Sequence, residues 1–256
     1  MLTKTFLHIP GIGPKTEEKL WQCGVTDWRC ALGYDDAPGF APDRWKTMRR
    51  HLQDSLQSLE ARDHAPFAHT LPCSEHWRSF SHFHDRVAYV DIETTGLRKD
   101  RSQITVIGVY DGVRTHSYIA GDNMDQFAED IESYSLLVTF NGQQFDIPFL
   151  RQAFPQVRWN HLHCDLRWSL KRLGHSGGLK KIEKRLGLSR DDAIDGLTGY
   201  DAVRLWHRYR RGDERALQVL VDYNAADVEN LEYLMQMVYA RLYDRLLKDV
   251  GDGPEH

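Results

Sequence analysis

The sequence predicts an α/β fold in which a mixed sheet is flanked by helices, with a small helical N-terminal region. Between residues 87 and 140, four short runs are rich in β-branched and aromatic residues, as is typical of strands. After residue 140, apolar residues recur mainly at helical spacing. Strands that come first in hairpins and are then interleaved with helices favour a mixed sheet with helices packed on it.

The composition is that of a globular protein. A chain of 256 residues can bury a full core and still leave room for a small appendage. No apolar run approaches the ~20 residues of a membrane span, and the first ten residues lack the apolar region of a secretory signal. We therefore expect a cytoplasmic protein without membrane contact. The four cysteines have no Cys-x-x-Cys spacing, which disfavours a zinc knuckle or a disulfide framework.

Residues 1–33 are predicted to form a segment that resembles a helix-hairpin-helix. Gly11 and Gly13 would offer backbone N–H groups to a phosphate at the start of the next helix, where Pro14 suits the first position. Only ten residues precede the hairpin, which weakens a first helix. Glu17 and Glu18 would repel a phosphate backbone, so a purely structural turn is an equal alternative.

Residues 34–84 are predicted to be a helical connector. Pro and Gly are concentrated in residues 35–42, which favours a linker there. A helix is expected next, because five large apolar residues recur at helical spacing. These residues are Trp45, Met48, Leu52, Leu56 and Leu59.

Residues 85–247 are predicted to form the main domain, and residues 248–256 a disordered tail. Strands are expected at residues 87–90, 104–110, 113–119 and 136–140. Asp111 and Gly112 would supply a two-residue hairpin turn between the second and third strands. Helices are expected to dominate from there to the C-terminus.

Acidic side chains follow the first predicted strand. Residues two apart on a strand point the same way, so Asp91 and Glu93 would share a face. An acidic pair at the edge of a core is electrostatically unfavourable, which indicates a functional site more often than it indicates simple solvation. Asp146 is a third candidate, although it would also suit the cap of a helix that carries Pro148 near its start.

A fourth acid lies in a predicted helix near the C-terminus. Tyr223 and Asp227 are four residues apart in a stretch without Gly or Pro, so both would project from one helical face. Asp227 sits among small apolar residues, where a buried carboxylate without a partner would be costly. Tyr223 has an alternative interpretation as an ordinary half-buried aromatic.

Carboxylates in this pattern are the ligands expected at a two-metal nuclease site. Hard cations take oxygen ligands, and two such ions about 3.5 to 4 Å apart can clamp both reacting oxygens of an in-line phosphoryl displacement. Asp91, Glu93 and Asp227 would hold two Mg²⁺ or Mn²⁺ ions directly. Asp146 would bind through water or complete the second site, and Tyr223 would orient the attacking water.

Three segments of the chain together resemble the exonuclease motifs of the DEDD superfamily. They are residues 91–96 (DIETTG), 141–146 (NGQQFD) and 223–227 (YNAAD). Because the third segment contains a tyrosine, the chain resembles the tyrosine subclass of this superfamily. Within the superfamily, it looks most like bacterial YprB-like proteins in residues 140–149, 178–183 and 223–228. The resemblance implies a ribonuclease H-like fold and 3'-to-5' hydrolysis of nucleic acid with Mg²⁺ or Mn²⁺. We also expect Thr94, Asn141 and Phe145 to contact substrate.

A basic segment is the predicted surface for the nucleic-acid backbone, although the formal net charge of the whole chain is -4. Residues 165–190 contain eight basic residues against two acidic ones, and among them Lys180 and Lys181 are expected to bind substrate. A solvated helix face is the alternative. Asp165 is expected to cap a helix. The basic residues are Arg167, Lys171, Arg172, Lys180, Lys181, Lys184, Arg185 and Arg190.

The sequence therefore predicts a divalent-metal-dependent 3'-5' exonuclease that acts on the 3' end of single-stranded DNA or RNA. A single strand is favoured because it can thread into a buried acidic site. Two alternatives are a ribonuclease H-like endonuclease, since related folds use similar carboxylates for internal cuts, and a non-catalytic nucleic-acid-binding module.

Overall fold

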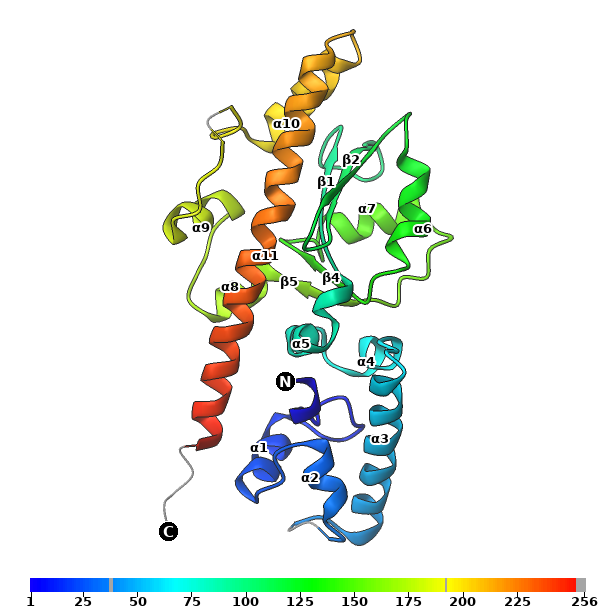
Figure 1. Ribbon diagram of the computed structural model, residues 1–256, viewed down its shortest axis with the longest axis vertical. Coiled ribbons are helices and arrows are strands. Elements are labelled where there is room, and N and C mark those ends of the chain that lie inside the picture. The colour runs from blue at the N-terminus through cyan, green and yellow to red at the C-terminus, as the bar shows by residue number, and fades with distance from the viewer. Residues whose placement is uncertain (37–38, 192, 252–256) are drawn as a thin grey trace.

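A five-stranded mixed sheet lies at the centre of the larger part of the molecule (Figure 1). The computed structural model describes residues 1–36, 39–191 and 193–251. The strand order is β3-β2-β1-β4-β5, with antiparallel pairs on the β3 side of β1 and parallel pairs on the β5 side. The strands are β1 (Val87–Thr94), β2 (Ile104–Tyr110), β3 (Thr115–Ile119), β4 (Leu136–Thr139) and β5 (Leu162–Asp165). The predicted α/β fold with a mixed sheet is confirmed.

The strands differ from the prediction in three details. β1 continues to Thr94, so Asp91 and Glu93 belong to the strand itself. β5 was not predicted, because a four-residue strand carries little periodic signal and depends on pairing with β4. The hairpin turn lies one residue later than predicted: the Asp111 carboxylate accepts hydrogen bonds from the amides of Val113 and Arg114, both at 2.8 Å, and so occupies the first turn position.

Helices cover both faces of the sheet (Figure 1). Residues 88, 90 and 92 of β1 pack into a core with α6 (Phe127–Ile131) and α7 (Asp146–Ala153). Residues 87 and 89 point the other way and pack with α11 (Glu214–Gly251). Asp91 and Glu93 continue this second row, so both side chains lie on the α11 side.

α11 is the longest helix and runs alongside β1, β2 and β4 (Figure 1). α10 (Gly199–Tyr209) packs against it, after α8 (Leu166–Arg172) and α9 (Leu179–Leu186). Because α11 continues to Gly251, residues 248–251 are helical, and the predicted start of a disordered tail at residue 248 is wrong. Residues 252–256 of that predicted tail lie outside the described residues.

Helices and turns make up the described residues before β1, namely 1–36 and 39–86. The predicted connector helix is α3, in which Trp45, Met48 and Leu52 are buried. Pro14 begins α1 as predicted, and the three-residue turn η1 precedes the hairpin among the described residues, so the resemblance to a helix-hairpin-helix stays a prediction. The elements are η1 (Leu2–Lys4), α1 (Pro14–Gln22), α2 (Trp28–Gly33), α3 (Pro42–Glu60), α4 (Ala65–Thr70), η2 (Cys73–Ser79), α5 (Phe80–Phe83) and η3 (His84–Arg86), with η4 (Met124–Gln126) after β3.

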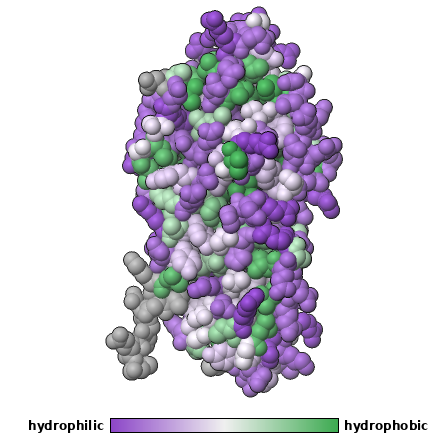
Figure 2. All heavy atoms as spheres, in the orientation of Figure 1, coloured by the Kyte–Doolittle hydropathy of each residue, from purple (hydrophilic) through white to green (hydrophobic). Residues whose placement is uncertain are grey.

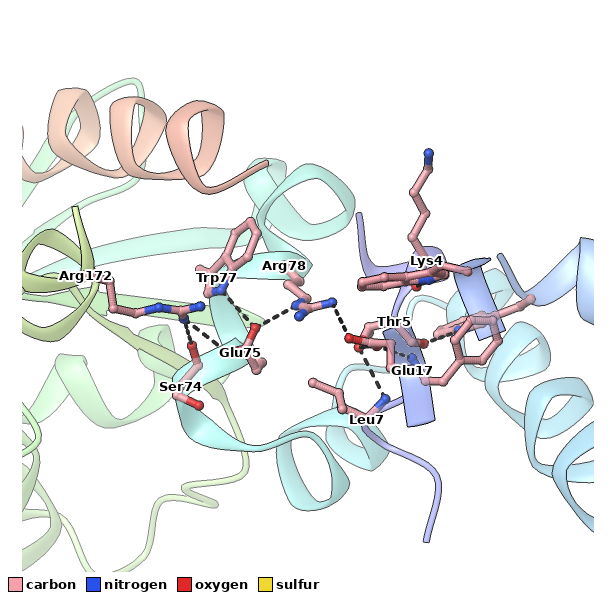
Figure 3. Close-up of polar contacts among 12 residues, drawn as sticks. Lys4, Thr5, Leu7, Glu17, Ser74, Glu75, Trp77, Arg78 and Arg172 are labelled. Carbon is pink, nitrogen blue, oxygen red and sulfur yellow. Dashed lines mark hydrogen bonds and ion pairs between the residues drawn. The ribbon is translucent and has the colours of Figure 1, made fainter. Parts of the chain in front are cut away.

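A chain of ion pairs joins the N-terminal helices to the sheet domain (Figure 3). Glu17 of α1 accepts hydrogen bonds from the Thr5 hydroxyl at 2.6 Å and from Arg78 of η2 at 3.2 Å. Arg78 also donates to Glu75 at 2.7 Å, and Arg172 of α8 donates to the same Glu75 at 3.1 Å. Glu17 is buried and paired with Arg78, so it would not repel a bound phosphate as expected, whereas Glu18 is exposed to solvent.

The face of the molecule seen in Figure 2 is mainly hydrophilic, with hydrophobic side chains in small separate patches. Leu97, Trp168 and Tyr200 are among the large hydrophobic residues exposed to solvent. No helix in residues 1–36, 39–191 and 193–251 combines the length and the apolar character needed to cross a membrane.

Candidate active site

Three carboxylates from two distant parts of the chain meet where α11 crosses β1. One oxygen atom each from Asp91, Glu93 and Asp227 lies within 4.8 Å of those of the other two. Asp91 and Glu93 come from the side of β1 that faces α11, and Asp227 comes from α11. The shared face predicted for Asp91 and Glu93 thus forms part of a cluster of hard oxygen donors, the kind that Mg²⁺ and Mn²⁺ prefer.

The close approach of α11 to the sheet depends on Gly108. This residue pairs with Asp91 across β1 and β2, and Asn224 of α11 packs directly over it. A Cβ atom at Gly108 would lie 2.1 Å from Asn224 Oδ1 and 3.0 Å from Asn224 Cγ. A larger residue would therefore push α11 away from the sheet and open the carboxylate cluster. The sequence analysis did not single out Gly108.

The carboxylate cluster opens into a cavity of about 500 Å³. All five residues predicted to act in catalysis line this cavity, namely Asp91, Glu93, Asp146, Tyr223 and Asp227. The predicted substrate contacts Thr94, Asn141 and Phe145 line it too. The exposed side chains of Leu97 and Tyr200 complete the wall, so a polar floor is joined to an apolar entrance.

Burial makes the negative charge of this cluster unfavourable. It raises the pKa of Asp91 and of Glu93 well above their usual ranges, and repulsion from neighbouring carboxylates raises both pKa values further. In the part of the chain that the structure describes, neither residue forms an ion pair with Lys or Arg, whereas Asp227 contacts Arg190. The negative charge of the three carboxylates is therefore only partly balanced by the protein, and divalent cations would balance the rest.

Asp146 lies beside the cluster at the start of α7. Its Oδ1 accepts a hydrogen bond from the backbone amide of Ile92 at 3.1 Å, and the residue is 2% exposed. Burial raises the pKa of Asp146 to about 7. The helix cap is the preceding residue, Phe145, so Asp146 links α7 to β1 and does not act as the capping residue considered from the sequence.

Asn224 holds the Asp91 carboxylate in place. Its Nδ2 donates to Asp91 Oδ2 at 3.0 Å, and it also lies 3.3 Å from the Asp91 carbonyl oxygen. Asn224 is fully buried. Asn224 was not predicted from the sequence as a site residue. It is a polar residue between Tyr223 and Asp227 in the third motif, and this position was the signal that could have identified it.

Tyr223 is fixed by Lys180. Lys180 Nζ donates to the Tyr223 hydroxyl at 2.8 Å and to the Leu197 carbonyl oxygen, and it lies 4.1 Å from the centre of the Tyr223 ring. Burial and the nearby carboxylates raise the pKa of Tyr223, so its hydroxyl stays protonated and can donate a hydrogen bond. Lys180 is half-buried at the site, whereas Lys181 is exposed to solvent, so the two do not form one surface.

Arg190 is buried between two acids. It contacts Asp227, and its Nε and Nη2 donate to the Glu183 carboxylate at 3.0 and 2.7 Å. Asn230 donates to the same carboxylate at 2.9 Å. The side chain of Arg190 is 4% exposed. The prediction that Arg190 belongs to the backbone-binding surface is therefore wrong, because its guanidinium is paired with Glu183 and Asp227 inside the protein.

Two other members of the predicted basic surface form ion pairs closer to solvent. Arg172 pairs with Glu75, and Lys184 Nζ lies 3.5 Å from Asp195. The eight basic residues lie on α8, on α9 and in the segment after α9. Because the side chain of Arg190 is turned into the interior, the eight do not all belong to one binding face.

The loop between β4 and α7 is held by Asp165 at the end of β5. The Asp165 carboxylate accepts hydrogen bonds from the amides of Asn141 at 2.7 Å and Gln143 at 3.1 Å. It also accepts from the amide of Arg167 at 3.1 Å, which confirms the predicted helix cap. Asn141 has φ +66°, a conformation that Asn tolerates better than most residues.

Gly11 and Gly13 do not line the cavity described above. Gly11 has φ +79°, and its carbonyl oxygen accepts a hydrogen bond from Arg44 at 2.8 Å. Gly13 is the residue before α1. The predicted phosphate contact at these glycines stays a prediction.

A family model described as the RNase_H superfamily matches residues 88–239. The chain is similar to the family B DNA polymerase of the archaeon Pyrobaculum calidifontis, with 16% identity and a TM-score of 0.48, over 59% of this chain but only 24% of the polymerase. It is also similar to Brucella melitensis NrnC bound to pGG (20% identity, TM-score 0.44, 67% of this chain and 81% of that one) and to NrnC with bound Mg²⁺ (21%, 0.43, 67% and 82%). A search of curated proteins gave no match.

Proposed function

Because this chain belongs to the RNase_H superfamily, we propose that it is a divalent-metal-dependent 3'-5' exonuclease acting on single-stranded nucleic acid. The observation that carries the proposal is the convergence of Asp91, Glu93 and Asp227 within 4.8 Å at the floor of a cavity. Tyr223 lies one helical turn before Asp227, which supports placement in the tyrosine subclass of the DEDD superfamily.

Asp91, Glu93 and Asp227 would hold two Mg²⁺ or Mn²⁺ ions, with Asp146 as a further ligand directly or through water. Two such ions, when bound, stabilise charge on both the attacking and the leaving oxygen of a phosphodiester. Asn224 contributes by fixing the orientation of Asp91, since ligands held by hydrogen bonds need less reorganisation on binding.

Tyr223 would orient the attacking water. Its hydroxyl stays protonated, so it acts as a hydrogen-bond partner for that water and not as the base that removes its proton. Lys180 would hold the phenol in place, because its Nζ donates a hydrogen bond to the Tyr223 hydroxyl at 2.8 Å. Arg190, which contacts Asp227, positions that carboxylate from the side of α9.

The burial of the acids supports a single strand. The four acids lie at its floor, and Glu93, Asp146 and Asp227 are each at most 7% exposed. A chain end can reach such a floor more easily than the middle of a duplex. The apolar entrance at Leu97 and Tyr200 suits the sugar and base of a terminal nucleotide.

The test uses matched 3'-labelled DNA and RNA strands with Mg²⁺, Mn²⁺ or a chelator. We expect release of mononucleotides that requires added metal and is abolished by Asp227→Asn. Asp222→Asn is the matched control, because Asp222 is an exposed acid on the same helix. Cleavage of a circular single strand would instead establish an endonuclease. Binding without hydrolysis under every metal condition would establish a non-catalytic module.

A further inference from the structure

A second cavity, which we call the α8 cavity, lies next to the candidate active site. It has a volume of about 290 Å³, and Trp168 and Arg172 of α8, Ser74 of η2 and Gln143 all line it. Gln143 belongs to the loop of residues 141–145, whose Asn141 and Phe145 line the active-site cavity. The two cavities therefore share this loop as a common wall.

Trp168 is a partly exposed aromatic residue, and two cations lie over its indole ring. The residue is 40% exposed. The guanidinium carbon of Arg167 lies 5.6 Å from the indole ring centre, and Lys171 Nζ lies 5.3 Å from it. Neither cation forms an ion pair within the described residues, and Arg167 instead donates to the side-chain oxygen of Asn141. The indole is thus tied, through Arg167, to a residue of the active-site wall.

The acids around the α8 cavity are already compensated. Asp165 accepts three backbone N–H groups, as described above. Glu75 accepts from Trp77, Arg78 and Arg172, as Figure 3 shows. Arg167 and Lys171 can therefore bind an anionic ligand. Single-stranded nucleic acid fits this site, because its phosphates are anionic and its bases can stack on an aromatic ring.

We propose that Trp168 stacks a nucleobase of the substrate strand upstream of its 3' end, while Arg167 and Lys171 contact the flanking phosphates. This inference rests on the proposed function, because it places the 3' end at the carboxylate cluster. The strand then passes over the loop of residues 141–145 and reaches Trp168. Stacking on an indole tolerates any base, so this subsite favours longer strands without selecting a sequence.

The kinetic test compares a dinucleotide with a strand of about ten nucleotides, a length within the range that single-strand sites cover. In Trp168→Ala, the ratio of kcat/KM for the longer strand to that for the dinucleotide should fall roughly 5- to 100-fold, as expected for one lost stacking contact. Trp168→Phe should retain most of the ratio. Tyr233→Ala is the control, because Tyr233 is an exposed aromatic of α11 (48%) outside both cavities.

A binding test that does not need catalysis uses a 5'-labelled strand in the presence of a chelator. Trp168→Ala should weaken the Kd from fluorescence anisotropy by a similar factor. Lys171→Ala should reduce the slope of log Kd against log salt concentration by roughly 0.7, the value for one lost contact to a single strand. In the wild-type protein, a strand that carries 5-iodouracil at successive positions should cross-link to Trp168 from an upstream position.

The outcomes separate the two proposals. If the wild-type protein degrades both strands, and Trp168→Ala keeps the wild-type ratio and Kd, the stacking subsite is overturned and the exonuclease stands. If the wild-type protein hydrolyses neither strand with any metal, the exonuclease fails. In that case, a Kd weakened in Trp168→Ala supports the stacking site, and an unchanged Kd overturns it.

Discussion

Arg190 bridges Glu183 and Asp227 in the interior, with all three side chains at most 8% exposed. The Arg190 guanidinium thus forms ion pairs both with a carboxylate of the candidate metal site and with a carboxylate of α9. Through this bridge, α9 and the segment that follows it are fastened to α11. The metal cluster and the packing of α9 are consequently linked by a single side chain.

Removal of Arg190 should destabilise the fold. Arg190→Ala leaves Glu183 and Asp227 buried without their counter-ion, so we expect a loss of about 3–5 kcal/mol in the free energy of unfolding, measured by urea titration without metal. Arg185→Ala, an exposed arginine of α9, should change it little. Mg²⁺ should restore more stability to Arg190→Ala than to wild type, because it supplies charge beside Asp227. Equal stability of the two chelated proteins would contradict this account.

Removal of Asn224 should weaken metal binding. Asn224→Ala frees the Asp91 carboxylate from its 3.0 Å hydrogen bond, and loss of such a supporting contact typically lowers metal affinity roughly 10- to 100-fold. Isothermal titration with Mn²⁺ would measure the Kd. Asp222→Asn on the exposed side of α11 provides the reference. An Asn224→Ala protein with wild-type Mn²⁺ affinity would show that Asp91 needs no such support.

The metal-free protein should carry a pH-dependent penalty at Asp146. Its pKa is raised by burial to about 7 from an ordinary value near 4, so the folded state prefers the protonated form. The stability that Asp146 contributes is fully present below pH ~4 and is lost as the pH rises towards and through ~7. Asp146→Asn cannot ionise. Relative to wild type in chelator, this variant should gain up to about 1.4 kcal/mol per pH unit over that window.

The relevant measurement is the difference in the free energy of unfolding between the two proteins at each pH. Taking the difference removes the effect of buried histidines such as His163. Burial lowers the pKa of His163 to about 3, so its contribution to stability depends on pH in the opposite direction. Mg²⁺ should stabilise the wild type more at pH 8 than at pH 6, because metal ions and protons compete for the same carboxylates. A difference that stays constant from pH 4 to 8 would rule out this role of Asp146.

Gly108→Ala should displace α11. The new Cβ would lie 2.1 Å from the side-chain oxygen of Asn224, so we expect a loss of about 1–3 kcal/mol, as for other overpacked cores, and a loss of nuclease activity. Gly33→Ala is the control, because its Cβ would meet no atom within 4 Å. In the double variant Gly108→Ala with Asn224→Ala, part of the stability should return. Additive effects of the two substitutions would exclude this steric contact.

Local sequence patterns were sufficient for much of the site. The alternation of strand residues placed Asp91 and Glu93 on one face, and the four-residue spacing on a helix placed Tyr223 and Asp227 together. Both patterns depend only on the backbone geometry of single elements. Local hydrogen bonding of an Asp before a helix likewise predicted the cap at Asp165. The N-terminal turn η1 was less predictable, since a three-residue turn has no periodic pattern.

The sequence by itself therefore determined which side chains each strand and helix presents, because this follows from the repeat of the local backbone. Only the tertiary structure decided that Arg190 turns inward to Asp227, that Lys180 reaches Tyr223 and that Asn224 fits over Gly108. The residues of each pair lie 37, 43 and 116 positions apart in the sequence. No local preference specifies such contacts: they form when α11 packs on the sheet and α9 lies beside α11, which brings these side chains together.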